Sequence, residues 1–158
     1  MKQLRVLFLH GKEGTPEGTK PTFLRDNGHY VIAPVLPKDD WELSKKRALD
    51  CLHAFKPHVV VGSSRGGAVA CAIDTGYVPK ILIAPAWTHF NDGHQPLVDD
   101  TTTVLHCPKD DLVKFDDTLE LVMKFGVKVL ACGEGHRMSD PEALEKLLHT
   151  VEQVLYNV

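Results

Sequence analysis

The sequence alternates regularly between short apolar runs and longer helix-like segments, and this pattern limits its fold more than any other feature. The runs are rich in β-branched residues and are continuously apolar, which is typical of parallel strands covered on both faces. Six such strands are predicted, over residues 4–9, 30–33, 59–61, 80–84, 102–106 and 127–131.

The segments around the strands have helical patterns, with apolar residues recurring on one face of each helix. These helices are predicted over residues 18–27, 41–55, 66–75, 117–125 and 141–156. Asp39 or Asp40 is expected to cap the second helix, and Asp116 and Asp117 the fourth.

Strands that alternate with helices form a parallel sheet with right-handed crossovers. We therefore predict an α/β fold, a doubly wound three-layer parallel sheet of about six strands in the order 2-1-3-4-5-6. Ligands bind such sheets beyond the carboxyl ends of the strands, at the switch point between strands 1 and 3. Functional residues are expected in the loops that follow Leu9 and Val61.

The length of 158 residues predicts a single domain, residues 1–158. A net charge of -3 and the lack of long basic blocks argue against nucleic-acid and membrane partners. The apolar runs are far too short to span a membrane, so a cytoplasmic protein is expected.

The cysteines have no CxxC spacing and are expected to be reduced thiols. Cys107 and Cys132 end strand-like runs, and a redox role for them stays open.

The loop after the third strand reads Gly62-Ser63-Ser64-Arg65-Gly66-Gly67 and matches the nucleophile-elbow pattern G-x-S-x-G, with Ser64 at its centre. A strand that turns directly into a helix forces the central residue into a strained backbone. Glycines on either side remove Cβ atoms that would clash, so the serine oxygen projects above the sheet. The backbone N–H of Arg65 then points from a helix N-terminus towards developing negative charge, as one donor of an oxyanion hole.

A serine nucleophile needs a base and an orienting acid, which follow an elbow of this kind in the order acid, then histidine. Asp110 after the fifth strand is the first candidate for the acid, and the neighbouring Asp111 is the alternative. His136 after the sixth strand is the candidate base. His10 and His106 also end strands, although histidines in such places more often support the loop that they start.

The loop after the first strand is rich in glycine but lacks both the phosphate-binding G-x-x-x-x-G-K-[ST] pattern and the G-x-G-x-x-G fingerprint. We instead expect this loop to supply the second oxyanion donor, a backbone N–H that we assign to Lys12. Gly11 is the alternative donor, because nothing in the sequence decides between the two amides.

Together these loops resemble the α/β-hydrolase superfamily, on Leu9-His10-Gly11, the elbow around Ser64, Asp110 followed by Leu112-Val113, and Gly135-His136. The short chain with a GSSxGG elbow is similar to the small bacterial esterases of the YqiA/YcfP-like family. This resemblance implies Ser64 as nucleophile, His136 as base and Asp110 as orienting acid. It also implies a minimal version of the fold, because residues 85–101 are too few for a large cap.

The leading hypothesis is a serine hydrolase that cleaves a carboxylic ester or thioester of a small acyl substrate through an acyl-enzyme. His10, Trp87 and Phe90 are expected to line a shallow, open pocket, and no metal or other cofactor is expected. The alternative is a non-catalytic, hydrolase-like binding or scaffold protein. A weaker alternative is a phosphate or nucleotide binder that uses the loop at residues 11–18. The substrate and the oligomeric state are left open.

Overall fold

The structure, a computed structural model, describes residues 2–157 and contains one sheet of six parallel strands. The strands run in the order β2-β1-β3-β4-β5-β6, which confirms the predicted order. Their bounds are β1 Arg5–Leu9, β2 Tyr30–Ile32, β3 Val59–Ser63, β4 Lys80–Ile83, β5 Thr103–His106 and β6 Lys128–Ala131.

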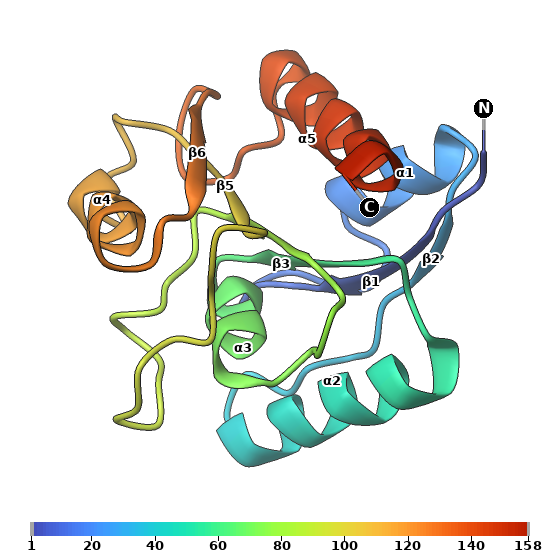
Figure 1. The fold of residues 1–158 in the computed structure, drawn as a ribbon, viewed down its shortest axis with the longest axis horizontal. Helices are drawn as coiled ribbons and strands as arrows, with labels where there is room; N and C mark the ends of the chain where they lie inside the picture. Colours follow the sequence, from blue (N-terminus) through green and yellow to red (C-terminus); the bar gives the residue numbers. More distant parts are fainter. Residues whose placement is uncertain (1, 158) are drawn as a thin grey trace.

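Helices cover both faces of the sheet, as the doubly wound fold requires. Their bounds are α1 Thr19–Asp26, α2 Trp41–Phe55, α3 Arg65–Ala72, α4 Phe115–Phe125 and α5 Pro141–Gln153, followed by the short 3-10 helix η1 Val154–Asn157. Figure 1 shows α1 and α5 together on one side of the sheet and α2 and α3 on the other. Helix α4 packs beside β5 and β6.

The two sides of the sheet bury separate apolar clusters, because successive strand residues point to opposite faces. In β1, Val6 and Phe8 pack in the cluster that includes α1 and α5. Leu7 and Leu9 pack in the other cluster, with residues of α2, α3 and α4. The continuous apolar runs thus reflect burial on both faces for β1, β3, β4 and β5, whereas the edge strands β2 and β6 are partly exposed.

Several helix ends differ from the sequence-based prediction. Helix α3 ends at Ala72 rather than at residue 75, and the chain turns to extended backbone at Ile73. Helix α4 begins at Phe115, so Asp116 and Asp117 lie in its first turn and are not caps. Their charge still favours the positive end of the helix. Asp40 caps α2, accepting a hydrogen bond from the N–H of Leu43 at 2.9 Å.

The parallel register brings the carboxyl ends of the strands to one edge of the sheet. Leu9 pairs with Gly62, Ser63 with Ile83, and His106 with Ala131. The loops that hold the candidate site residues leave the sheet at this edge. No helix among residues 2–157 combines the length and the apolar character needed to cross a membrane.

Candidate active site

Ser64 stands at a strained turn between β3 and α3. Its φ of 54° and ψ of -115° lie in a region that residues with a side chain rarely adopt. Two backbone hydrogen bonds hold the turn: the N–H of Ser64 donates to Ile83 at 2.9 Å, and the N–H of Ala86 donates to the Ser64 carbonyl at 3.0 Å. These contacts hold Ser64 in a backbone conformation that is unfavourable by itself, as is usual for strained residues at functional sites.

The glycines of the elbow are needed for close packing of α3 on the sheet. A Cβ atom at Gly62 would lie 2.5 Å from the carbonyl oxygen of Gly66. One at Gly66 would overlap the backbone carbonyl of Leu9 in β1. Because helix and strand approach so closely, Ser64 is raised above the sheet edge, as the sequence pattern predicts.

Ser64, His136 and Asp110 form a chain of hydrogen bonds. The Oγ of Ser64 lies 2.9 Å from Nε2 of His136, and Nδ1 of the same imidazole lies 2.7 Å from Oδ2 of Asp110. A carboxylate only accepts, so Nδ1 carries the proton and Nε2 of the neutral ring accepts from the serine hydroxyl. This tautomer is the one in which the imidazole can take the hydroxyl proton.

The Asp110 side chain is fully buried and heavily hydrogen-bonded. Its side chain is 0% exposed, and its Oδ1 accepts from the N–H groups of Leu112 at 2.8 Å and Val113 at 2.9 Å. Burial acts to raise the pKa of Asp110, but the hydrogen bonds from Val113, His136 and Leu112 outweigh it and lower that pKa. Asp110 thus stays ionised beside His136, whereas Asp111 is exposed.

A second histidine, His106, also contacts Asp110. Its Nε2 lies 3.0 Å from Oδ2 of Asp110 and 3.1 Å from the Val113 carbonyl, and its Nδ1 lies 2.7 Å from the hydroxyl of Thr118. The pattern fits a neutral ring that donates from Nε2 and accepts at Nδ1, and burial lowers the pKa of His106. The sequence favours two roles for His106, a competing base or support for the loop that it starts, and these contacts with Asp110 and Val113 are of the second kind. The available signal was the position of His106 at the end of β5, directly before the loop that contains Asp110 and Val113.

The loop that carries His136 is held by the start of α5. The N–H of Gly133 donates to Oε1 of Glu142, and the N–H of Glu134 donates to Oδ1 of Asp140, each at 3.1 Å. Met138, 2% exposed, anchors the far side of the loop in the core. His136 therefore reaches Ser64 from a loop tied down at both ends, not from a free one.

Two backbone segments, the start of α3 and residues 11–12, lie next to Ser64. Arg65 is the first residue of α3, so its N–H has no carbonyl partner within the helix. Gly11 lies against Ser64, since a Cβ atom at Gly11 would be 3.3 Å from the serine Cβ. Gly11 and Lys12 both line the cleft in front of Ser64. The assignment of Lys12 as oxyanion donor, with Gly11 as alternative, stays a prediction.

The Arg65 side chain turns away into the protein and is 2% exposed. Its guanidinium lies 5.6 Å from the ring centroids of both Trp41 and Phe90, and Nη2 donates to the Pro37 carbonyl and to Ser44. Nε and Nη1 have no hydrogen-bond partner among the described residues. The two aromatic faces offset part of the cost of burying this cation, which ties the elbow to the loop before α2.

Comparison with solved structures identifies the architecture. A candidate hydrolase of the alpha/beta superfamily from Xanthomonas campestris is 18% identical, with a TM-score of 0.79 over 100% of both chains. Est1E from Butyrivibrio proteoclasticus is 14% identical, with a TM-score of 0.75 over 99% of this chain and 88% of that one. Mouse alpha/beta hydrolase domain-containing protein 10 is 17% identical, with a TM-score of 0.75 over 99% of this chain and 91% of that one.

The chain has the α/β-hydrolase fold. No protein-family model and no curated protein matches its sequence. The narrower resemblance to the YqiA/YcfP-like esterases stays a prediction. In this version of the hydrolase fold, the connection from β4 to β5 contains neither helix nor strand, so no helical cap is built there.

The hydrolase fold leaves an open cleft of about 680 Å³ in front of Ser64. The residues that line it include His10, Phe90 and the exposed side chain of Leu112. The ring of His10 joins its own loop to the segment after β2: Nδ1 lies 2.7 Å from the Gly11 carbonyl, and Nε2 accepts from the Leu36 N–H at 2.9 Å.

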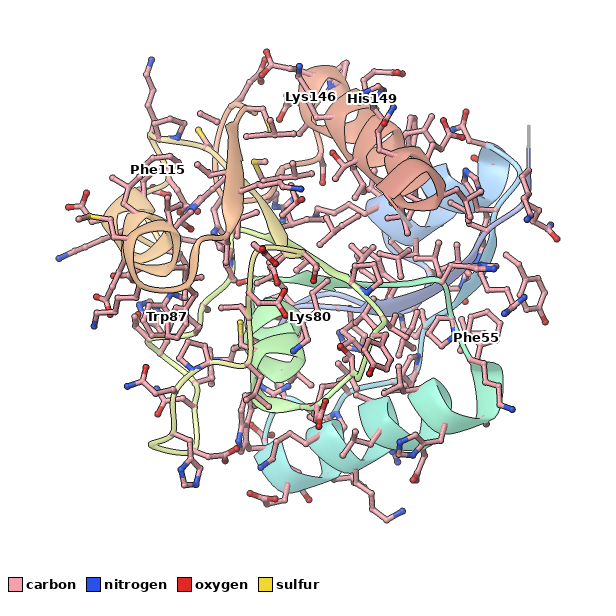
Figure 2. All side chains as sticks on the ribbon, in the orientation of Figure 1. Phe55, Lys80, Trp87, Phe115, Lys146 and His149 are labelled. Carbon is pink, nitrogen blue, oxygen red and sulfur yellow. The ribbon has the colours of Figure 1, made fainter. Side chains whose placement is uncertain are left out.

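Trp87 does not line the Ser64 cleft, and that prediction is wrong. Its indole N–H donates to the Asp117 carbonyl at 3.0 Å, so the side chain lies against α4 (Figure 2). Trp87 instead lines an adjacent apolar cavity of about 210 Å³, which shares Phe90 with the cleft. The indole hydrogen-bonds Asp117, which lies 30 residues further along the chain, and local sequence does not reveal such a contact.

The cysteines near the site are buried. Cys107 is 1% exposed and Cys132 is 4% exposed, and burial raises the pKa of the Cys132 thiol to about 11. Thiols of this kind behave as small apolar side chains. Among residues 2–157, no group of three His, Cys, Asp or Glu side chains is arranged to hold a metal ion.

Proposed function

We propose that this protein is a serine hydrolase that cleaves a carboxylic ester or thioester through an acyl-enzyme. The observation that carries the proposal is the hydrogen-bonded chain from Ser64 through His136 to the ionised, buried Asp110 at the mouth of an open cleft. Similar structures described as esterases or hydrolases support it. These include the esterase domain of a Rhodothermus marinus protein.

The geometry allows a complete acyl-transfer cycle. Nε2 of His136 accepts the Ser64 proton while Oγ bonds to the acyl carbon, and the amides of Arg65 and Lys12 donate to the resulting oxyanion. The imidazolium gives its proton to the departing alcohol or thiol, and the acyl-serine ester remains. Asp110 favours the imidazolium because it keeps its negative charge throughout.

Hydrolysis of the acyl-enzyme repeats these proton transfers with water. His136 takes a proton from a water molecule, the hydroxide bonds to the acyl carbon, and the serine oxygen leaves with the proton from Nε2. The products are a carboxylic acid and free Ser64. The lack of a cap over the cleft favours short acyl groups, since nothing encloses a long chain.

The test is covalent labelling with a fluorophosphonate, read by intact mass. The wild type is expected to gain one adduct, and Ser64→Ala none. The neighbouring Ser63→Ala variant, altered in the same elbow, is the matched control and is expected to gain the adduct. With 4-nitrophenyl acetate, Ser64→Ala is expected to lose about 10⁴-fold or more in kcat while it keeps its fold. A folded wild type that takes no adduct would overturn the proposal and favour the non-catalytic binding protein.

A further inference from the structure

The wall of the Ser64 cleft is positively charged, although the whole chain has a net charge of -3. Apart from the histidines, its lining has one negatively charged side chain, Glu13. The positively charged ones are Lys12, Lys20, Arg65 and Arg137. The Arg65 guanidinium is turned away between Trp41 and Phe90, which leaves three lysine or arginine cations for the cleft.

Two of these cations, Lys20 and Arg137, come together from distant parts of the chain. Lys20 lies in the first turn of α1 and is half-buried, and Arg137, which directly follows His136, is exposed. Burial and the charge of Arg137 lower the pKa of Lys20 to about 8, so Lys20 is still largely protonated at neutral pH. The pair is therefore a concentration of positive charge beside the reacting groups.

Neither cation has a carboxylate partner in the part of the chain that the structure describes. Lys45 differs from them in this respect: its side chain is 16% exposed, and it pairs with both Glu42 and Asp92. Those two partners raise the pKa of Lys45, whereas nothing raises that of Lys20. Two like charges close together repel each other, and an anion bound between them would relieve that repulsion.

The start of α1 adds to the positive field. No side chain caps this helix, and its first turn contains no acidic residue. Thr19 and Lys20, whose N–H groups have no carbonyl partner within the helix, both line the cleft. This arrangement favours a negatively charged group next to Lys20.

We propose that Lys20 and Arg137 bind a carboxylate or phosphate group of the substrate, so that the protein prefers anionic to neutral esters or thioesters. This inference rests on the proposed hydrolase function and names its substrate class. A guanidinium can hold two oxygens of such a group at once, and the ammonium supplies a second charge. The anionic group lies outside the reacting bond and fixes the orientation of the substrate.

The test compares kcat/KM for two matched pairs of esters. In one pair the charge is on the acyl part: 4-nitrophenyl hydrogen adipate against 4-nitrophenyl hexanoate. In the other it is on the leaving group: 4-acetoxybenzoate against its neutral methyl ester. The wild type is expected to favour the anionic member of at least one pair by about tenfold, and that pair shows where the anion lies. No preference in either pair would overturn the proposal.

Variants locate the preference. Lys20→Met and Arg137→Gln are expected to abolish it, and Lys20→Arg, which keeps the charge, to retain it. Lys128→Met removes an exposed cation at the start of β6, away from the cleft, and is expected to leave the ratio unchanged. Added NaCl is expected to weaken the preference. A preference that survives Lys20→Met in a protein with wild-type circular dichroism would contradict the assignment.

A binding experiment separates this inference from the proposed function. Adipate is expected to raise the Tm of the inactive Ser64→Ala protein but not that of Ser64→Ala combined with Lys20→Met. If adipate raises the Tm in this way but the wild type hydrolyses no ester, the anion site is upheld and only the proposed hydrolase function is overturned. Hydrolysis without the shift and without a charge preference would overturn only the anion site.

Discussion

The imidazole of His106 donates to Oδ2 of Asp110 at 3.0 Å, the same oxygen that accepts from His136 at 2.7 Å. Together with two backbone N–H groups on Oδ1, this places four donors on one buried carboxylate. Asp110 is thus fixed in position as well as in charge. His106 acts through Asp110 and is a positioning residue.

Replacement of His106 by Phe is expected to lower kcat about 10-fold to 100-fold, because Asp110 then loses one of the contacts that orient it. KM for 4-nitrophenyl acetate is expected to change little, since His106 does not line the cleft. Steady-state kinetics of the folded variant measures both constants. An unchanged kcat would show that the backbone donors alone position Asp110.

Stability is expected to fall as the pH drops below about 6.5, the ordinary pKa of histidine. Burial lowers the pKa of His106, so the unfolded chain takes up a proton there before the native protein does. The loss begins at the unfolded-state pKa and ends below the native one. Urea unfolding at pH 7.5 and 5.5 measures it, and His106→Gln is expected to lose less stability over this range. Equal losses in the two proteins would contradict the assignment.

Strain at Ser64 predicts an unusual order of stabilities. Ser64→Gly is expected to be about 1 kcal/mol more stable than Ser64→Ala, since only glycine adopts a φ of 54° with a ψ of -115° at little cost. Both variants lack the hydroxyl, so chemical denaturation of the pair isolates the backbone contribution. An alanine variant as stable as the glycine variant would show that the turn is not strained.

The elbow glycine Gly66 is expected to tolerate no methyl group. Gly66→Ala is expected to cost about 3 kcal/mol or more, because the new Cβ overlaps the Leu9 carbonyl in the centre of the sheet. Gly135→Ala, in the His136 loop, has open space around its Cβ and is the matched control. Thermal unfolding of both variants compares the two sites. A wild-type Tm for Gly66→Ala would mean that α3 can move off β1 at little cost.

The buried thiols are expected to be unreactive in the native protein. With a pKa of about 11, Cys132 has very little thiolate at pH 8, and Cys107 is equally inaccessible. A disulfide reagent such as DTNB is expected to reach at most the half-buried Cys51 quickly, and all four cysteines after unfolding. Rapid modification of Cys107 or Cys132 under native conditions would reopen a redox role for them.

Local sequence determined most of the architecture. Apolar runs without alternation favour strands covered on both faces, and the helices between them favour parallel pairing. The strand order then followed from a doubly wound sheet that begins at a central strand. The elbow was also local, because a glycine on each side of Ser64 is a steric requirement of one tight turn. Chain order was enough to name Asp110 and His136 as candidates for its partners.

Tertiary structure alone decided which side chains meet. It placed Asp110 rather than Asp111 beside His136, joined His106 to the same carboxylate, and turned Trp87 away to α4. It also brought Lys20 of α1 to Arg137, far along the chain. Periodicity describes which face of an element is apolar, but hydrogen bonds and charge contacts depend on the relative placement of loops from separate strands. The fold could therefore be predicted from pattern, whereas the electrostatics of the cleft could not.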